Sequence, residues 1–444
     1  MEFAWLVYVL VEEVVGLWHD TCDFFLTLDA AQFVATFWGT LCLDIPRYVC
    51  TDILMLGLAV CESRRTRRQP TAALSQPRAQ PLVSVIVSAL NEEHTILYTL
   101  RSLFEQTYPH LEILVVDEGS TDQTSALCQP FAERGQIRLF SYGARMGKSA
   151  AVNLGFKFSQ GAYIVIIDAD STFDRDAFAR LLRYFDDPRV GAVAGNLRVR
   201  NRSGGLAVRL QAIEYLLSIS MGRRFAAWAH VLNIVSGAFG AFRREVFAAI
   251  GGHDVGPGED ADSTLKARKL GVKIAFAHDA ICMTEVPATF RQLWRQRLRW
   301  ERSFVRLRLR KHRNLLYPHW SVFRWSNCLG YLDVFFFQFV RALALPVYLV
   351  SLLVSYPHLF LVIMLLTQLG YIGLTLLQFF VALGLSERPA EDARLWPYVL
   401  LYSLHHLLFL RPNRLLAVAE ELLFRRSYSD PYVPPRVSQR GIRW

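Results

Sequence analysis

The residues whose side chains are best suited to binding or catalysis are Gln296, Arg299 and Trp300, which fall in a strongly basic stretch between positions 295 and 313. The surrounding pattern predicts a helix from Thr289 to about Arg310. On such a helix, the guanidinium would offer positive charge to a diphosphate, and the indole would offer a flat wall to a sugar ring. The alternative is an amphipathic helix resting on anionic lipid, and one helix can serve both purposes through different faces.

Two aspartates separated by one residue, Asp168 and Asp170, follow the apolar run 163–167. The run predicts a buried strand, so the first carboxylate lies at its carboxyl edge, and the period of two puts both carboxylates on one side. Two hard oxygen ligands with open positions suit Mg²⁺ or Mn²⁺ bridging a diphosphate. The alternative is a helix-capping pair before Ser171.

A phosphate site is expected around Lys148, which opens a helix directly after Gly147. Backbone amides, the helix dipole and the ammonium would converge there. The spacing is not that of a Walker A loop, and a solvated lysine is the alternative. Asp117 ends another expected strand and could accept a hydrogen bond from a nucleobase or a ribose hydroxyl, although an Asp before a Gly turn is common in ordinary loops.

A candidate general base follows the glycine-rich loop 251–258, at Gly258-Glu259-Asp260. A carboxylate at the start of a helix is ordinarily a cap. Transfer to a hydroxyl also needs a group that removes its proton, and Asp260 stands at a suitable place in the order of motifs. Capping and catalysis do not exclude each other.

Alternating strand and helix patterns position these residues. They predict an α/β domain with a mostly parallel sheet, whose ligands bind at the carboxyl ends of the strands. A cap at Ser120 or Thr121 is expected for the helix that starts at Asp122. The expected strands are 83–88, 113–116, 137–140 and 163–167, and the expected helices are 93–106, one from Asp122 onward, and 148–158.

Apolar segments gather at the two ends of the 444-residue chain, which is 52% hydrophobic. The stretch 1–18 is short and carries Glu12 and Glu13, and 31–62 is interrupted by Asp44, Pro46 and Arg47. Ionisable groups at such depth usually face a protein interior or an aqueous path, and a kink at Pro46 is the alternative. Segments 329–354 and 357–384 are long enough to span, with Arg341 as the one basic interruption, and 396–411 is marginal.

The formal charge of +10 is concentrated beside the apolar segments, at 64–68 and 295–313. Basic residues flanking spans mark the cytoplasmic side. Nucleic acid is disfavoured as a partner, because no reader motif accompanies the charge. The seven cysteines show no paired spacing, which fits a reducing compartment. The N-terminus lacks the basic region of a cleavable signal peptide, so we expect insertion through mature spans.

The order of these motifs resembles that of the processive, inverting family-two glycosyltransferases. That group includes the cellulose, chitin, hyaluronan and poly-N-acetylglucosamine synthases and the rhizobial chitin-oligosaccharide synthase. The similarity covers roughly residues 80–315. It implies an α/β, GT-A (Rossmann-like) cytoplasmic catalytic domain inserted between N- and C-terminal transmembrane helices. The motifs that carry it are Asp117, Asp168-x-Asp170, Gly258-Glu259-Asp260 and Gln296-x-x-Arg299-Trp300.

The resemblance also implies a role for each matched residue. Asp260 is the expected catalytic base, and Asp170 is the expected ligand of a Mg²⁺ or Mn²⁺ cofactor. Nucleotide-sugar binding is expected of Asp117, Lys148, Asp168, Asp170 and Arg299. Acceptor binding is expected of Ser236, Gly237, Glu259, Gln296 and Trp300.

The implied activity is polymerisation of a UDP-sugar into a β-linked exopolysaccharide, with translocation across the cell membrane. The alternatives are transfer onto a lipid-linked acceptor and an inactive glycan-binding scaffold. The expected partners are a UDP-sugar, the growing polysaccharide and the bilayer; the donor sugar and the oligomeric state are not readable. The expected divisions are N-terminal membrane segments at 1–62, a basic linker at 63–80, the GT-A domain at 81–288, an interfacial basic helix with its connector at 289–326, C-terminal membrane segments at 327–411, and a cytoplasmic or interfacial tail at 412–444.

Overall fold

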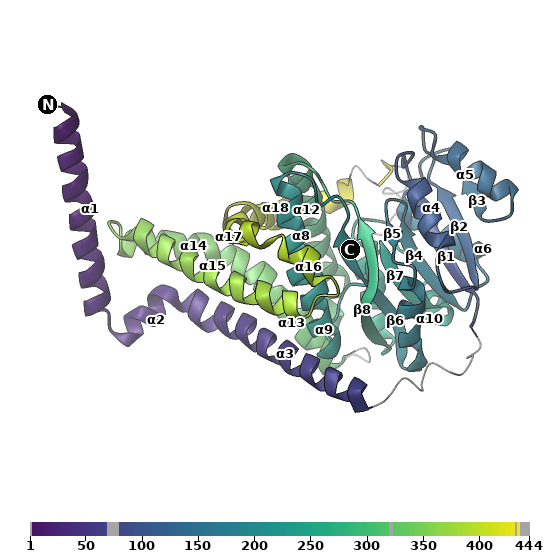
Figure 1. The fold of residues 1–444 in the computed structure, drawn as a ribbon, viewed down its shortest axis with the longest axis horizontal. Helices are drawn as coiled ribbons and strands as arrows, with labels where there is room; N and C mark the ends of the chain where they lie inside the picture. The colour runs from purple at the N-terminus through teal and green to yellow at the C-terminus, as the bar shows by residue number, and fades with distance from the viewer. Residues whose placement is uncertain (1, 69–79, 319–322, 431–432, 436–444) are drawn as a thin grey trace.

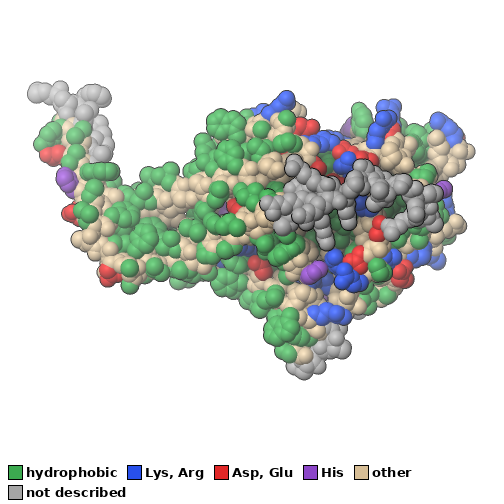
Figure 2. Space-filling view, turned by 60° about the horizontal axis from the view of Figure 1, so that its bottom comes forward, with side chains coloured by type: hydrophobic (Ala, Val, Ile, Leu, Met, Phe, Trp, Pro, Cys, Tyr) green, Lys and Arg blue, Asp and Glu red, His purple; other side chains and the backbone are tan. Residues whose placement is uncertain are grey.

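The computed structural model describes residues 2–68, 80–318, 323–430 and 433–435. An α/β body lies at one end of the molecule, and long helices extend from it, with the N-terminal helix standing apart at the far end (Figure 1). Apolar side chains cover much of the helical end, whereas lysines and arginines gather on the α/β body (Figure 2).

One eight-stranded sheet forms the centre of the body, in the order β3-β2-β1-β4-β7-β6-β8-β5. Its first four strands run parallel, which confirms the alternation read from the sequence. They are β1 (Val83–Ala89), β2 (Leu111–Asp117), β3 (Arg138–Ser141) and β4 (Tyr163–Asp168). The near-continuous apolar runs of β1 and β4 fit strands that are covered on both faces.

The other half of the sheet is mixed, which corrects the expectation of a mostly parallel sheet. β7 (Phe239–Arg243) runs antiparallel to both β4 and β6 (Val190–Val199). β8 (Lys273–Thr284) is parallel to β6, and the two-residue β5 (Thr172–Phe173) is antiparallel to β8. Because Phe239 pairs with Ile167, the start of β7 lies at the carboxyl end of β4. The segment just before β7 therefore lies at the edge of the sheet that carries Asp168 and Asp170.

The two faces of the sheet bury two apolar clusters, as the alternation of side chains requires. Val85 and Ile167 belong to one cluster, and Ile86 and Ile166 belong to the other. The helices of this half are α4 (Ile96–Phe104), α5 (Thr124–Glu133), α6 (Lys148–Phe158), α7 (Ala177–Leu182), η3 (Arg183–Asp186), α8 (Leu206–Glu214), η4 (Tyr215–Gly222), α9 (Arg223–Trp228), α10 (Arg244–Ala249) and α11 (Glu259–Lys269).

The expected cap of α5 is wrong. The N–H of Thr124 donates to Asp122 at 3.0 Å, whereas the hydroxyl of Ser120 accepts from the N–H of Asn91 at 2.9 Å. By contrast, the basic helix is confirmed as α12 (Phe290–Arg306), continued by η5 (Leu307–Lys311) and η6 (Arg313–Leu316). Thr289 and Gln292 form a capping box that fixes its start.

The N-terminal segments differ from expectation in two ways. Residues 2–18 belong to a longer helix, α1 (Glu2–Thr27), and Pro46 is the second residue of α3 (Ile45–Arg68), directly after a π-helical turn. α2 (Ala30–Trp38) leads into α3 through a π-helical turn, η1 (Gly39–Asp44). The arginines at 64–68 end α3 instead of opening a linker, and 69–79 lie outside the described residues.

Two helices in the described part of the chain are long and apolar enough to cross a membrane, Trp325–Ser355 and Phe360–Gly384. The first is continuous through α13 (Trp325–Val334), η7 (Phe335–Val340) and α14 (Arg341–Ser355), and the second is α15. The C-terminal elements that follow are α16 (Pro389–Ala393), α17 (Trp396–His405), η8 (His406–Leu410), α18 (Arg411–Phe424) and η9 (Arg426–Ser429).

The loop between α15 and α17 is tied into the sheet by buried charges. Arg198 of β6 is 1% exposed and pairs at 2.8 Å with Asp392, which is fully buried. Asp392 also accepts from Arg202 at 2.9 Å, and Arg388 pairs with Asp174 at 2.6 Å. Phe379 of α15 joins one of the apolar clusters of the sheet. These contacts fix the apolar helices against the body.

Candidate active site

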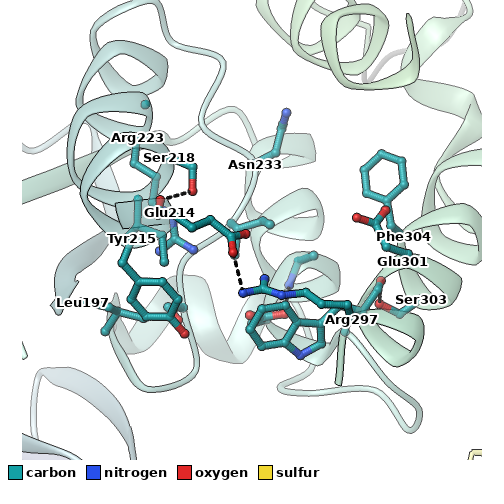
Figure 3. Close-up of a pocket in the computed structure, with 18 of the residues that line it drawn as sticks. Leu197, Glu214, Tyr215, Ser218, Arg223, Asn233, Arg297, Glu301, Ser303 and Phe304 are labelled. Carbon is teal, nitrogen blue, oxygen red and sulfur yellow. Dashed lines mark hydrogen bonds and ion pairs between the residues drawn. The ribbon is translucent and has the colours of Figure 1, made fainter. Parts of the chain in front are cut away.

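A cavity of about 1410 Å³ lies between the sheet and the long helices. It reaches from the carboxyl end of β4, past the first turns of α6 and α11, to side chains of α3, α13, α15 and α18. Part of its wall is drawn in Figure 3, where the side chains of Glu214 and Arg297 point toward each other and form an ion pair. Its length suits an extended ligand better than a single small one.

Lys148 and Asp168 meet at one end of this cavity. Asp168 is the last residue of β4, and Lys148 is the first of α6, after Gly147 at φ 85°. Their side chains form an ion pair, and the Lys148 ammonium lies 3.8 Å from Glu259. Burial alone would lower the pKa of Lys148, but Asp168 and Glu259 outweigh it and hold the pKa above the usual value. The ammonium thus stays charged and is available to a phosphate.

Asp170 lies beside this pair in an oxygen-rich corner. Burial, followed by the charges of Asp168 and Glu92, raises the pKa of Asp170 to about 7. Its carboxylate accepts from Ser171 at 3.2 Å and from Thr284 at 3.4 Å. Within the described ranges, no three His, Cys, Asp or Glu side chains gather as a metal-binding group. One or two carboxylates completed by substrate phosphates are a usual Mg²⁺ arrangement, so the donor set fits a divalent cation.

Asp260 lies in the first turn of α11, where Gly258 adopts the left-handed conformation at φ 81°. Burial, followed by the neighbouring Glu259, raises the pKa of Asp260 to about 6. One carboxylate oxygen accepts from the N–H of Ala261 at 2.7 Å. A carboxylate with this pKa is ionised at neutral pH and is a stronger base than an exposed one.

Gly237 brings Lys148 and Asp260 together. A Cβ at Gly237 would lie 2.9 Å from Lys148 Nζ and 3.9 Å from the Cβ of Asp260. Ser236 and Gly237 therefore lie beside Lys148 and Asp260, because they precede β7 and β7 starts at the carboxyl end of β4. Both residues line the cavity, as does Glu259.

The loop that precedes Asp260 rests on α12. Arg306 donates from Nη2 to the carbonyl oxygen of Pro257 at 2.6 Å. A Cβ at Gly256 would lie 2.3 Å from Arg306, and a Cβ at Gly258 would lie 2.7 Å from Ser303. Glycine is required at both places by this close approach and by φ values of 123° and 81°.

Gln296, Arg299 and Trp300 all line the cavity. Arg297, between them, also lines the cavity and pairs with Glu214 of α8 at 2.9 Å (Figure 3). Its guanidinium also lies 4.5 Å from the centre of the Trp300 ring, which holds the indole in place. The side-chain oxygen of Gln296 is buried and has no protein hydrogen-bond donor in the described residues, so a ligand can supply one.

Asp117 is the one predicted site residue that does not line the cavity. Its carboxylate accepts from the Ser120 N–H at 2.9 Å and from the Ser141 hydroxyl at 3.1 Å, as a turn-stabilising group does. Glu118 lines the cavity instead, and burial raises its pKa to about 7. All other predicted site residues line this one cavity.

Several lining residues were not expected from the sequence. Glu92 adds a carboxylate near Asp170, and Glu118 adds one near Lys148 and Asp168. Arg223 of α9 places a buried Nη1 without a protein acceptor in the described residues. Glu118 could have been suspected from its place beside Asp117. No local pattern marks Arg223.

The helical part of the cavity carries charged and polar groups among apolar side chains, as the charges within the apolar segments suggested. Arg47 and Arg341 both line it. Arg47 pairs with Asp333 at 3.2 Å, whereas Arg341 and the hydroxyl of Tyr371 both contact the buried Asp44. Hydrogen-bonding groups thus continue beyond the α/β body.

A mixed sheet with a carboxylate pair at the end of β4 and an acidic helix start at its edge defines a glycosyltransferase domain of the GT-A fold. The sequence comparison agrees, since residues 84–251 match the family described as "Glycosyl transferase family 2". Residues 84–251 therefore form a domain similar to the family-two glycosyltransferases.

Curated relatives are poly-beta-1,6-N-acetyl-D-glucosamine synthases. That of Staphylococcus epidermidis is 30% identical over 255 residues, covering 57% of this chain and 60% of the relative. That of Staphylococcus aureus (strain COL) is 32% identical over 220 residues, covering 49% and 53%. The matches thus span 60% or less of the length of these relatives. A mannosyltransferase from Pyrobaculum calidifontis, solved with GDP-Man and Mn²⁺, has the same fold at a TM-score of 0.53 and 24% identity, covering 82% of this chain and 98% of that one.

Proposed function

We propose that this chain is a membrane-embedded, inverting glycosyltransferase that polymerises a UDP-sugar into a β-linked polysaccharide and passes the product across the membrane. The observation that carries the proposal is the continuity of the cavity. It joins the carboxylate pair, the candidate base and the acceptor-side tryptophan to a polar space between the long helices. A single-sugar transferase would not need that extension.

The reaction is a single displacement. Asp260 removes the proton from the terminal hydroxyl of the acceptor, whose oxygen bonds to the anomeric carbon as the bond to the diphosphate breaks. Inversion follows because attack and departure occur on opposite faces. Lys148 and Arg299 offset the charge that grows on the departing UDP, in a cavity where water screens it weakly.

Asp170, with Asp168, would hold a Mg²⁺ or Mn²⁺ ion, which supplies further positive charge next to the diphosphate. Asp117 supports the nucleotide pocket through its turn, and Glu118 is the carboxylate of this pair that faces the ligand. Each of these side chains is placed by the end of a strand or the start of a helix, so little reorganisation is needed on binding.

The acceptor lies on the opposite side of the base. Trp300 presents its ring to the terminal sugar, and Gln296, Ser236 and Gly237 border the same space. Glu259 keeps Lys148 oriented and lies beside the reacting hydroxyl. The basic residues at the ends of α3 and α12 favour a cytoplasmic catalytic domain beside the inner face of the cell membrane.

The test is release of UDP by purified protein in lipid nanodiscs, supplied in turn with a panel of UDP-sugars and Mn²⁺. The printed names of the relatives place UDP-N-acetylglucosamine first in the panel. We expect release with one donor, a polymeric product, and loss of both in Asp260→Asn. A matched control is Asp176→Asn, a surface carboxylate paired with Arg180 at 2.6 Å.

Two outcomes would replace the proposal. Addition of one sugar to a lipid-linked acceptor would identify a non-processive transferase. Absence of UDP release with every donor, together with glycan binding, would identify an inactive scaffold. Equal release by Asp260→Asn and wild type would remove Asp260 as the base.

A further inference from the structure

We propose that the helical end of the cavity holds a binding site for an oxyanion carried by the acceptor, with Arg411 and Arg341 as its ligands. The inference rests on the proposed function in one respect, that the acceptor occupies this cavity. It adds the chemical class of the acceptor, which that function leaves open.

Arg411 is the first residue of α18 and lines the cavity. Its guanidinium carbon lies 5.3 Å from the centre of the Tyr371 ring, so the group is held against an aromatic face. Its Nε is buried and has no hydrogen-bond acceptor among the described residues. None of the ion pairs in the described chain includes Arg411. A cation whose Nε is buried thus lines the cavity without an ion-pair partner among the described residues.

Arg341 approaches the same place from α14. Its Nη1 contacts Asp44, and its Nη2 is buried without a partner in the described ranges. The second oxygen of Asp44 accepts from Tyr371. Both oxygens of Asp44 are therefore engaged by Arg341 and Tyr371, and Arg411 on the other side of Tyr371 has no carboxylate among the described residues, which leaves a positive charge.

The neighbouring charges do not cancel this excess, because each is already paired. The surrounding pairs are Arg47 with Asp333 at 3.2 Å, Arg414 with Glu301 at 2.8 Å, and Arg297 with Glu214 at 2.9 Å. His406, Gln368 and Gln378 also line this part of the cavity. They can donate hydrogen bonds but supply no negative charge.

The site lies on the acceptor side of the base. Arg414 is one turn along α18 from Arg411 and pairs with Glu301, which directly follows Trp300. An acceptor whose end stacks on Trp300 and continues between the helices passes Arg411 a short distance further on. Arg411 therefore meets an internal part of the acceptor and not the reacting sugar.

Paired guanidinium groups with free donors bind carboxylates and phosphates more strongly than neutral hydroxyls. Two acceptors present such a group. One is a glycan that contains an acidic sugar, whose carboxylate recurs along the chain. The other is a lipid-linked acceptor, whose phosphate joins the sugar to the lipid.

The test is binding to the full chain in nanodiscs, measured by microscale thermophoresis with three probes. They are a hyaluronan tetrasaccharide, which carries carboxylates, a neutral chitotetraose, and a polyprenyl phosphate. We expect one of the two anionic probes to bind at least about tenfold more tightly than chitotetraose, and the tighter of them identifies the source of the oxyanion. Equal affinity for all three probes, or no binding of either anionic probe, overturns the proposal.

Substitutions at Arg411 test whether this residue causes the preference for the anionic probe. Arg411→Gln should weaken the affinity for the anionic probe about tenfold and change the affinity for chitotetraose by no more than about twofold. Arg411→Lys should retain part of the preference for the anionic probe. Arg101→Gln, on the exposed side of α4, is the control for loss of one positive charge. An unchanged preference in Arg411→Gln contradicts the assignment. If that variant fails to fold, the comparison of probes on the wild type still decides.

UDP release, measured on the same preparation, separates this proposal from the proposed function. Release without any anionic preference overturns the oxyanion site and leaves the transferase intact. An anionic preference without release, for every donor, overturns the transferase and leaves the oxyanion site standing.

Discussion

The guanidinium of Arg306 donates a 2.6 Å hydrogen bond to the carbonyl oxygen of Pro257, across 49 residues of sequence. This hydrogen bond therefore links the loop of the proposed base, Asp260, to the helix of Trp300. The hydrogen bond is present without bound substrate.

Arg306→Met should lower kcat about tenfold with little change in the KM for the donor, because loss of a hydrogen bond from a charged group displaces Asp260 and not the nucleotide pocket. Steady-state UDP release measures both constants. Arg291→Met, at an exposed position on the same helix, is the control. A rise in the donor KM with an unchanged kcat would contradict this role.

The pH profile should report the ionisation of Asp260, whose pKa burial and Glu259 raise to about 6. Below that pH the carboxyl is protonated and cannot accept a proton, so kcat/KM, measured at saturating Mn²⁺ to keep Asp170 ionised, should rise with pH up to about 6 and then level off. Glu259→Gln removes a negative charge that raises this pKa, and the acid limb should move to lower pH. Glu105→Gln, outside the cavity, should leave it in place. If the acid limb of Glu259→Gln stays at the same pH or moves to higher pH, a group other than Asp260 is responsible for it.

Gly237→Ala should raise the KM for the UDP-sugar several-fold, because the new methyl would lie 2.9 Å from Lys148 Nζ and force that flexible side chain away from Asp168. The melting temperature should change little, since the end of a lysine moves easily. Gly143→Ala, where no atom lies within 4 Å, is the matched control. A large loss of stability with normal donor affinity would refute the explanation.

Removal of divalent cations should abolish UDP release. Dialysis against a chelator is expected to lower the rate about a hundredfold, and Mn²⁺ or Mg²⁺ should restore it. Asp170→Asn should remain inactive after the metal is added back. Full activity after chelation would show that Lys148 and Arg299 suffice for the leaving group.

The buried pair Arg198–Asp392 should be costly to break from one side. Asp392→Ala leaves a buried guanidinium uncompensated and should reduce the free energy of unfolding by about 3–5 kcal/mol. Replacing both residues, with Met and Leu, should recover much of this loss. Thermal unfolding followed by tryptophan fluorescence measures the effect. Glu105→Ala, which removes an exposed pair with Arg175, should have a small effect.

The parallel half of the sheet could be predicted because its strands are short apolar runs separated by helices of crossover length. The direction of β7 could not, because a five-residue strand carries no local mark of direction. It is set by pairing of Phe239 with Ile167, a contact between segments far apart in sequence. That pairing is also what brings Gly237 beside Lys148.

A place in the cavity could be predicted where a side chain follows directly from an element end, as with Asp168, Lys148 and Asp260. The expectation for Asp117 did not place its carboxylate in the cavity. Adjacent residues at the end of a strand point in opposite directions, and the sequence alone does not say which of Asp117 and Glu118 faces inward. The contact of Arg306 with Pro257 could not be predicted from the sequence either, because it depends on how α12 packs against a loop distant in sequence.

The loop between α15 and α17 also bears on how the protein is made. Arg198 contacts Ser386, 188 residues later in the chain, and shares Asp392 with Arg202. While the ribosome is still synthesising the long helices, the finished part of the sheet holds an arginine whose counter-charge does not yet exist. The α/β body therefore cannot complete this buried ion pair until the segment that follows α15 has been synthesised.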